Sequence, residues 1–158
     1  MKRVFILAAL CATPAEARTA LGTFERWGAF RDEAPLRCFA IAEPVRRSGG
    51  KWRSFASVAT WPQAGVRGQL HIRLAREKLA DAPVILSIGA RRFTLVASGA
   101  DAWSPDPRAD AAIVAAMRSA PAMSVSTSAA TGAGFAETYA LKGAATAMDA
   151  AALGCARR

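Results

Sequence analysis

Alternating apolar and polar residues recur along the chain after residue 22, and they predict a mainly β protein. The clearest segment is 69–74, where Leu70, Ile72 and Leu74 fall on one face and polar residues fall on the other. That alternation is typical of a strand with one buried and one solvated face. The other segments with strand character are 23–31, 36–42, 52–61, 84–88, 91–97, 123–127 and 135–141.

Turns separate these predicted strands. Gly89 and Ala90 lie between two of them, and a Gly-X pair suits a type II′ hairpin because glycine adopts the positive φ without a steric penalty. Further turns or loops are predicted at 32–35, 44–50 and 131–134.

The spacing of apolar residues predicts a helix in the middle of the chain. Asp106 is a favourable N-cap residue, and Pro107 is favourable at the first helical position. An apolar stripe then follows at helical spacing as far as Met117, and Pro121 bounds the segment.

A second, alanine-rich helix is expected from about residue 144. It would place Met148, Ala152 and Cys155 on one face, unless Gly154 ends it one residue before the cysteine. The predicted fold is therefore mainly β, an antiparallel sandwich or sheet, with two helices packed on it, one mid-chain and one C-terminal.

The first 17 residues have the layout of a secretory signal peptide. A positive n-region at residues 2–3 precedes an apolar run at 4–12, and residues 15–17 form an A-x-A cleavage site. Cys11 offers an alternative, a lipoprotein acylated at that residue, although the residue before it is a leucine rather than a small residue.

Cleavage after residue 17 would leave one β-rich domain at 18–158, in the periplasm or secreted. The apolar run is too short to span a membrane as a mature helix. No later segment of the sequence resembles a transmembrane span, so we predict none in the mature chain.

Two cysteines, Cys38 and Cys155, remain after that cleavage. In an oxidising compartment two thiols most simply form one disulfide, and this pair is the predicted bridge. Two free thiols and an intermolecular bridge are the alternatives. A redox role of the thioredoxin type is not indicated, because the sequence has no C-x-x-C motif.

The chain carries a formal net charge of +9. For an exported protein this charge favours anionic lipid headgroups, lipopolysaccharide phosphates or acidic polymers over nucleic acid as partners, although it also serves solubility alone. The densest cations are Arg46, Arg47, Lys51 and Arg53, which flank a Gly-Gly turn beside Trp52. This segment is either a contact for an anionic surface or a solvated turn whose Trp52 packs in the core.

The sequence offers little catalytic chemistry. His71, the single histidine, falls on the polar face of its predicted strand, where a surface role fits better than metal binding. Asp101, Asp106 and Asp110 cluster in sequence, but capping and helix-dipole roles explain the last two. We predict no catalytic, cofactor-binding or metal-binding residue, and we expect the tryptophans to belong to the core rather than to a ligand pocket: Trp27, Trp52, Trp61 and Trp103.

Two stretches resemble a known family. Arg92-Phe93-Thr94-Leu95, and the residues 138–143 (TYALKG) running into an alanine helix, are similar to invasion-associated locus B-type proteins of alphaproteobacteria. The resemblance implies a small, exported, disulfide-bearing protein, linked to host-cell invasion in some pathogens and without a known catalytic activity.

The sequence therefore predicts an exported, non-enzymatic envelope or interaction protein whose partner is an unknown envelope component, a protein or an anionic lipid surface. The alternative is a periplasmic lipid- or small-molecule-binding β-domain, which an apolar cavity would favour.

Overall fold

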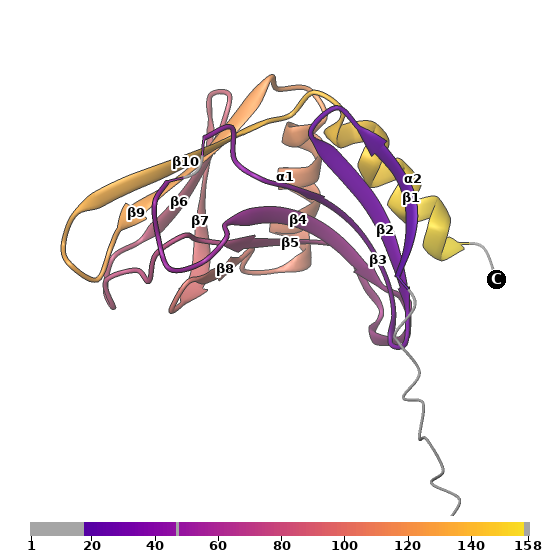
Figure 1. Ribbon diagram of the computed structural model, residues 1–158, viewed down its shortest axis with the longest axis horizontal. Helices are drawn as coiled ribbons and strands as arrows, with labels where there is room; N and C mark the ends of the chain where they lie inside the picture. Colours follow the sequence, from indigo (N-terminus) through magenta and orange to yellow (C-terminus); the bar gives the residue numbers. More distant parts are fainter. Residues whose placement is uncertain (1–17, 47, 157–158) are drawn as a thin grey trace, which may run out of the picture.

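The computed structural model describes residues 18–46 and 48–156, and within them one antiparallel sheet carries two helices (Figure 1). This is the predicted fold class. The sheet has ten strands in the order β1-β2-β3-β4-β5-β8-β7-β6-β9-β10. The strands are β1 Arg18–Phe24, β2 Trp27–Glu33, β3 Leu36–Ala42, β4 Phe55–Trp61, β5 Val66–Arg73, β6 Val84–Ile88, β7 Arg91–Ser98, β8 Asp101–Trp103, β9 Ala122–Ser128 and β10 Gly134–Ala140. The helices are α1 Pro107–Met117 and α2 Ala144–Ala156, with a short 3₁₀ turn at Pro62–Ala64.

The strongest patterns are confirmed. The predicted strands 36–42 and 84–88 have the bounds of β3 and β6. Leu70, Ile72 and Leu74 are all fully buried, as the alternation along β5 requires. Gly89 has a φ of 56° in the two-residue connection to β7, so the hairpin uses the conformation for which glycine was expected.

Two strands differ from the prediction. The predicted strand 23–31 is wrong, because a hairpin turn at Glu25 and Arg26 divides it into the end of β1 and the start of β2. Glu25 has a φ of 56°, and the segment contains no Asn, Pro or Gly at the turn to signal it. The short strand β8 was also missed, because only its central residue, Ala102, is buried.

Both helices pack on one face of the sheet. Helix α2 lies across β1, β2 and β3, while α1 packs mainly on β5 (Figure 1). Small side chains such as Ala29 and Ala40 are fully buried in this core, which allows α2 to approach the strands closely.

Helix α1 begins as predicted, with the Asp106 carboxylate accepting the Ala109 N–H at 2.8 Å. Asp110, however, is not a surface helix-dipole residue. It is only 6% exposed, and its Oδ1 accepts hydrogen bonds from the Leu70 N–H at 2.8 Å and from the Ser104 hydroxyl. The carboxylate therefore joins α1 to β5 and to the residue that follows β8, a role its position in sequence did not indicate.

Helix α2 does not end at Gly154 but continues to Ala156. A Cβ atom at Gly154 would lie 2.5 Å from Leu21 Cδ1, so the glycine permits close contact with β1. Its carbonyl accepts a hydrogen bond from Arg31 Nη1 at 2.6 Å. Among the described residues, neither helix has the length and apolar character needed to cross a membrane.

Candidate functional site

The loop between β3 and β4, described at residues 43–46 and 48–54, is hydrogen-bonded to the rest of the molecule at three places; we call it the basic loop. The Val45 N–H donates to the Thr138 carbonyl of β10 at 2.7 Å, and the Trp52 N–H donates to the Ala75 carbonyl at 3.2 Å. Arg76 Nε donates to the Gly49 carbonyl at 2.7 Å. These three bonds position the described residues on either side of Arg47 against β10 and the residues that follow β5.

Gly50 is required by the close packing of this loop. A Cβ atom there would lie 2.2 Å from the Ala75 carbonyl oxygen, well inside any allowed contact. Of the pair Gly49 and Gly50, which in sequence is a turn signal, Gly50 therefore also lets the loop lie against the residues after β5.

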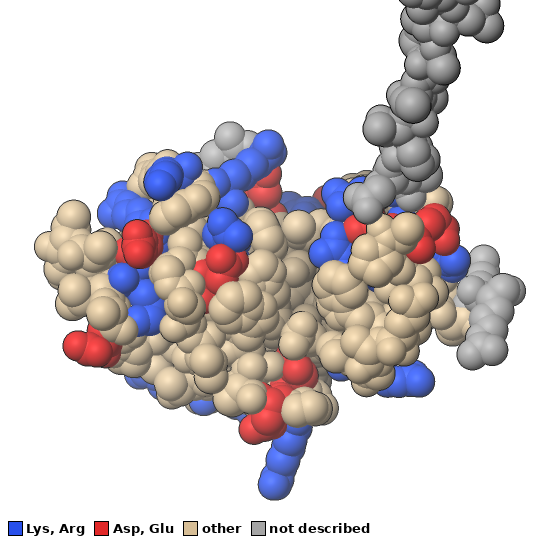
Figure 2. Space-filling view, turned by 90° about the horizontal axis from the view of Figure 1, so that it is seen from below, with Lys and Arg blue, Asp and Glu red and all other residues tan. Residues whose placement is uncertain are grey.

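The cations of the basic loop fall into two groups. Arg46 and Lys51 are exposed, and no carboxylate in the described part of the chain pairs with either. Arg53 is paired with Glu43. Arg47, the fourth predicted contact, lies outside the described residues. Figure 2 shows basic side chains gathered at the end of the molecule that carries this loop.

Trp52 is partly buried and packs against the core, with the Lys51 ammonium 4.9 Å from the centre of its ring. The indole therefore packs as part of the fold, which agrees with the interpretation of this segment as a solvated turn. The exposed cations, and not the tryptophan, form the outward surface of the loop.

A buried polar cluster lies beneath the basic loop. The Ser48 hydroxyl donates to Glu137 Oε1 at 2.6 Å, and Glu137 is only 1% exposed. Burial raises the pKa of Tyr139 far above its usual range, the Glu137 charge raises it further, and the nearby Ser54 hydroxyl opposes the rise. Glu137 Oε2 and the Tyr139 hydroxyl form no hydrogen bond of good geometry within the described structure.

Sequence reasoning missed this cluster, although strand alternation carried a signal. In β10, Phe135, Glu137 and Tyr139 share one face, so a carboxylate falls between two aromatic residues on the buried side. The contact with Ser48 spans 89 positions and was not visible in the sequence.

The single histidine lies on the opposite, helix-free face of the sheet. His71 stacks on Trp103 with ring centres 5.1 Å apart and meets Phe55 edge-on at 5.3 Å. Asp101 Oδ1 lies 2.7 Å from His71 Nε2 and 2.7 Å from Arg73 Nε. His71 lies on the predicted face of its strand, but it is only partly exposed, and its pairing with Asp101 was missed together with β8.

No hydroxyl is coupled to the His71 ring in the described structure. The adjacent Ser57 donates to the main-chain carbonyl of His71 at 3.4 Å and not to the imidazole. The cluster therefore lacks the nucleophile-to-base hydrogen bond that a serine hydrolase needs. Within the described ranges, no group of three or more His, Cys, Asp or Glu side chains is arranged to hold a metal.

The tryptophans divide between core and surface. Trp27 is fully buried, as expected. Trp61 and Trp103 are only partly buried and lie on the helix-free face, so the core prediction is wrong for both. The Arg37 guanidinium lies 4.9 Å from the Trp61 ring centre, and such stacking explains how a large aromatic side chain is tolerated there.

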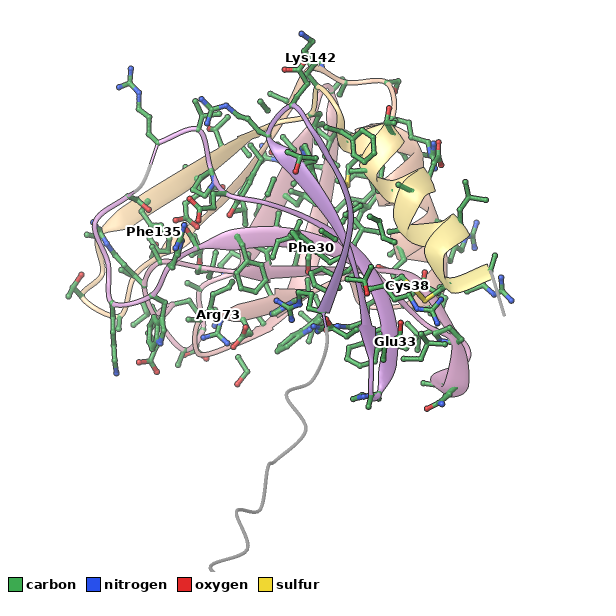
Figure 3. The ribbon with its side chains drawn as sticks, turned by 45° about the vertical axis from the view of Figure 1, so that its right-hand side comes forward. Phe30, Glu33, Cys38, Arg73, Phe135 and Lys142 are labelled. Carbon is green, nitrogen blue, oxygen red and sulfur yellow. A yellow bond between two sulfur atoms is a disulfide. The ribbon has the colours of Figure 1, made fainter. Side chains whose placement is uncertain are left out.

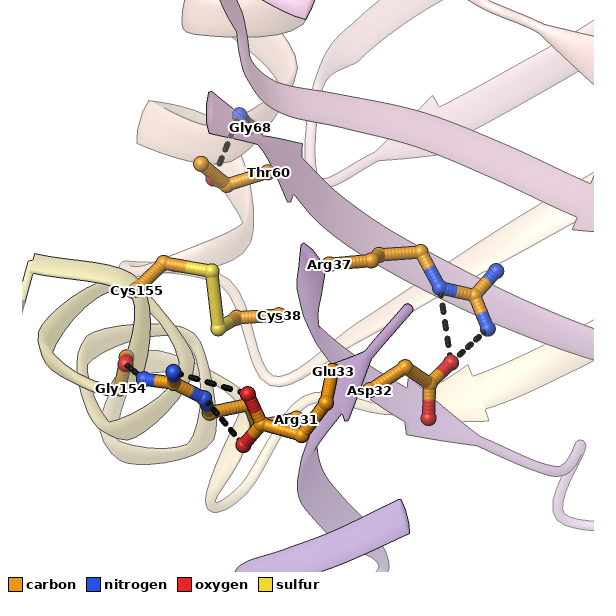
Figure 4. Close-up of a disulfide and its surroundings, with 9 residues drawn as sticks. All are labelled: Arg31, Asp32, Glu33, Arg37, Cys38, Thr60, Gly68, Gly154 and Cys155. Carbon is orange, nitrogen blue, oxygen red and sulfur yellow. Dashed lines mark hydrogen bonds and ion pairs between the residues drawn. A yellow bond between two sulfur atoms is a disulfide. The ribbon is translucent and has the colours of Figure 1, made fainter. Parts of the chain in front are cut away.

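The disulfide joins the end of α2 to the sheet. Cys38, fully buried on β3, is bonded to Cys155 with a Cα–Cα distance of 5.7 Å, so the predicted pairing is confirmed in the structure (Figure 4). Figure 3 shows Cys38 beside the last turns of α2. Arg31 reinforces the same junction through its bond to Gly154 and its ion pair with Glu33.

A groove lies between the two helices, over β4 and β5; we call it the inter-helix groove. It consists of two adjoining cavities of about 320 and 350 Å³ that share Thr60, Arg67 and Ala152. The smaller lies between α1 and α2, and the larger continues from it between α2 and the start of β5, with no α1 residue in its wall. The larger contains Cys155 in its wall, and the smaller contains Cys38. The remaining lining residues are Val58, Pro62, Gly65, Val66, Gly68, Ala111, Val114, Arg118, Met148, Ala151 and Ala156.

The comparisons with known proteins do not assign a family. No family model matches the chain, and neither a curated protein nor a solved structure is significantly similar to it. The likeness to invasion-associated locus B-type proteins therefore rests on the residues that carry it.

Proposed function

We propose that the chain is an exported, non-enzymatic envelope protein that acts by binding, comparable to the invasion-associated locus B-type proteins that it resembles. The signal-peptide pattern at 1–17, which lies outside the described residues, supports export to the periplasm or beyond. The Cys38–Cys155 disulfide also supports export, because such bonds persist in oxidising compartments.

The observation that carries this proposal is the fixed basic loop. Arg46 and Lys51 stand exposed on a segment whose backbone is bonded to Thr138, Ala75 and Arg76. Because these bonds already position the described residues of the loop, those residues lose little conformational freedom when they meet a partner. Its exposed charge fits an anionic partner, which for an envelope protein is a lipid headgroup surface.

Replacing Arg46, Arg47 and Lys51 together by Ser should weaken binding to anionic vesicles about a hundredfold at low salt. Each cation near an anionic surface contributes roughly 1 kcal/mol. Raising the ionic strength should weaken the wild type in the same way, because exposed charges are screened beyond about 10 Å at 0.1 M salt. Co-sedimentation with phosphatidylglycerol vesicles measures both effects, and the circular dichroism spectrum should be unchanged.

The matched control replaces Arg26, Arg92 and Arg108 by Ser, because all three are exposed and lie outside the basic loop. This variant loses the same net charge and should retain most of the binding. Equal losses in the two variants would show that net charge alone is responsible. If the wild type does not bind vesicles at all, a protein partner replaces the lipid surface in the proposal.

The mature protein isolated from its native periplasm should begin at Arg18. This follows from the A-x-A site at residues 15–17. Intact-mass spectrometry with N-terminal peptide mapping measures it. An uncleaved Met1, or a lipid-modified Cys11, would contradict the proposed processing.

A second candidate function is the binding of a lipid or small molecule. The inter-helix groove favours it, because adjoining cavities of about 320 and 350 Å³ fall in the size range of small-ligand sites.

A further inference from the structure

We propose that the inter-helix groove binds one fatty acid, with the hydrocarbon chain between α1 and α2 and the carboxylate against Arg67. This inference deepens the second candidate function and rests on it. It does not depend on the basic loop, whose residues do not line the groove.

The walls of the groove suit a hydrocarbon chain. Val114 and Ala111 line it from α1, and Met148 and Ala151 line it from α2, while Val58 lies on the floor. These side chains offer no hydrogen bonds. An extended peptide would leave its backbone polar groups without partners against such walls, whereas an acyl chain has none to satisfy.

The floor of the groove contains one neutral polar side chain, Thr60, besides the cation Arg67. Thr60 Oγ1 accepts the Gly68 N–H at 3.3 Å, a bond that bridges β4 and β5 (Figure 4). Thr60 lines both cavities, and its O–H remains a donor from which a carboxylate beside Arg67 can accept.

The charge at the groove selects an anionic head group. Arg67 lines both cavities and is exposed, and its side chain has no hydrogen bond or ion pair within the described structure. Arg118, in the smaller cavity, is by contrast held by Asp149 across the two helices at 2.6 Å. Arg67 is therefore the cation available to a carboxylate, which it can bind through two N–H groups.

The groove is held open by covalent and ionic links. The Cys38–Cys155 bond fixes the end of α2 to β3, and the Arg118–Asp149 pair joins the two helices nearby. A preformed cavity needs no reorganisation when a ligand enters, which favours binding.

The test uses the mature, disulfide-bonded chain, stripped of bound lipid on a hydrophobic resin and titrated calorimetrically with laurate below its aggregation limit. One laurate per chain is expected. Arg67→Gln should weaken laurate binding about tenfold, Arg67→Lys should restore most of it, and Arg108→Gln is the charge-matched control. The cation dodecyltrimethylammonium should bind at least tenfold more weakly than laurate to the wild type.

A steric variant tests where the hydrocarbon chain of laurate lies. Ala152 is exposed and lines both cavities, so Ala152→Phe fills the groove without entering the core and should reduce laurate binding at least tenfold. Leu153→Phe, on the next and outward-facing position of α2, adds a comparable ring outside the groove and should leave binding unchanged.

Several results would overturn the inference. The inference is wrong if the stripped wild type does not bind laurate, or if it binds laurate and the cationic amphiphile with equal affinity. It is also wrong if Arg67→Gln leaves the affinity for laurate unchanged. A dimer in sedimentation that Ala152→Phe dissociates would assign the groove to a second copy of the chain. Tight binding of the cationic amphiphile alone would retain the second candidate function while rejecting the fatty acid.

Discussion

Replacing Cys38 and Cys155 together by Ala is expected to lower the free energy of unfolding by about 4 kcal/mol. The bond closes a loop of 117 positions, and cross-links over long loops restrict the unfolded chain most strongly. Urea denaturation of the mature chain, followed by tryptophan fluorescence, measures the change. This loss is a large fraction of the stability of a typical single domain.

Reduction provides the control for this prediction. A reductant should shift the wild type to the midpoint of the double-Ala variant and leave that variant unchanged. Non-reducing peptide mapping should recover the Cys38–Cys155 peptide pair from protein made in the periplasm. Two free thiols there, or a variant as stable as the wild type, would contradict the stabilising role of the bond.

Replacing Asp110 by Ala should destabilise the fold by about 3 kcal/mol. The carboxylate is buried and accepts from both the Leu70 N–H and the Ser104 hydroxyl. Its removal leaves these donors without partners beneath α1, and buried unpaired donors are costly. The same urea titration measures the effect.

The matched comparison for Asp110 is Asp106→Ala on the same helix. Asp106 is an exposed N-cap with one bond to the Ala109 N–H, so its loss should cost only about 1 kcal/mol. Equal costs for the two substitutions would show that Asp110 contributes no more than an ordinary helix-terminal carboxylate.

The contrast between these two aspartates shows what the sequence could predict. Asp106 precedes a proline and an apolar stripe, so its capping role is local and was predictable. The partner of Asp110, Leu70, lies 40 positions away, and only the packing of α1 on β5 brings the two together. Local patterns predict elements well, while contacts between distant elements depend on the tertiary fold.

The same distinction between local patterns and tertiary contacts explains which strands could be predicted. Alternation predicted the second half of β5 because Leu70 and Ile72 are buried between partly exposed residues, and Gly89 located the β6–β7 turn because only glycine adopts its φ readily. The turn at Glu25 carries no such signal. Its conformation is held by the pairing of β1 with β2, which the residues of the turn do not encode.

The candidate sites were predictable in part. Consecutive cations marked the basic loop in the sequence, but its anchoring to Thr138 and Arg76 was not visible there. The inter-helix groove had no sequence signal, since it depends on the spacing between two helices that were each predicted separately. Nothing in the sequence singled out Arg67, because its position in the groove depends on the same spacing.

The links between the two ends of the chain constrain when folding can finish. The Trp27 indole donates to the Ala140 carbonyl, and Arg31 binds Gly154, so strands made early are completed by residues made 113 and 123 positions later. A chain emerging from its N-terminus onward must wait for α2 before the faces of β1, β2 and β3 are covered. Such high contact order slows folding and prolongs the exposure of unpaired apolar surface. Until α2 has been made this surface stays open, so the packing of α2 on β1, β2 and β3 is the step that ends its exposure.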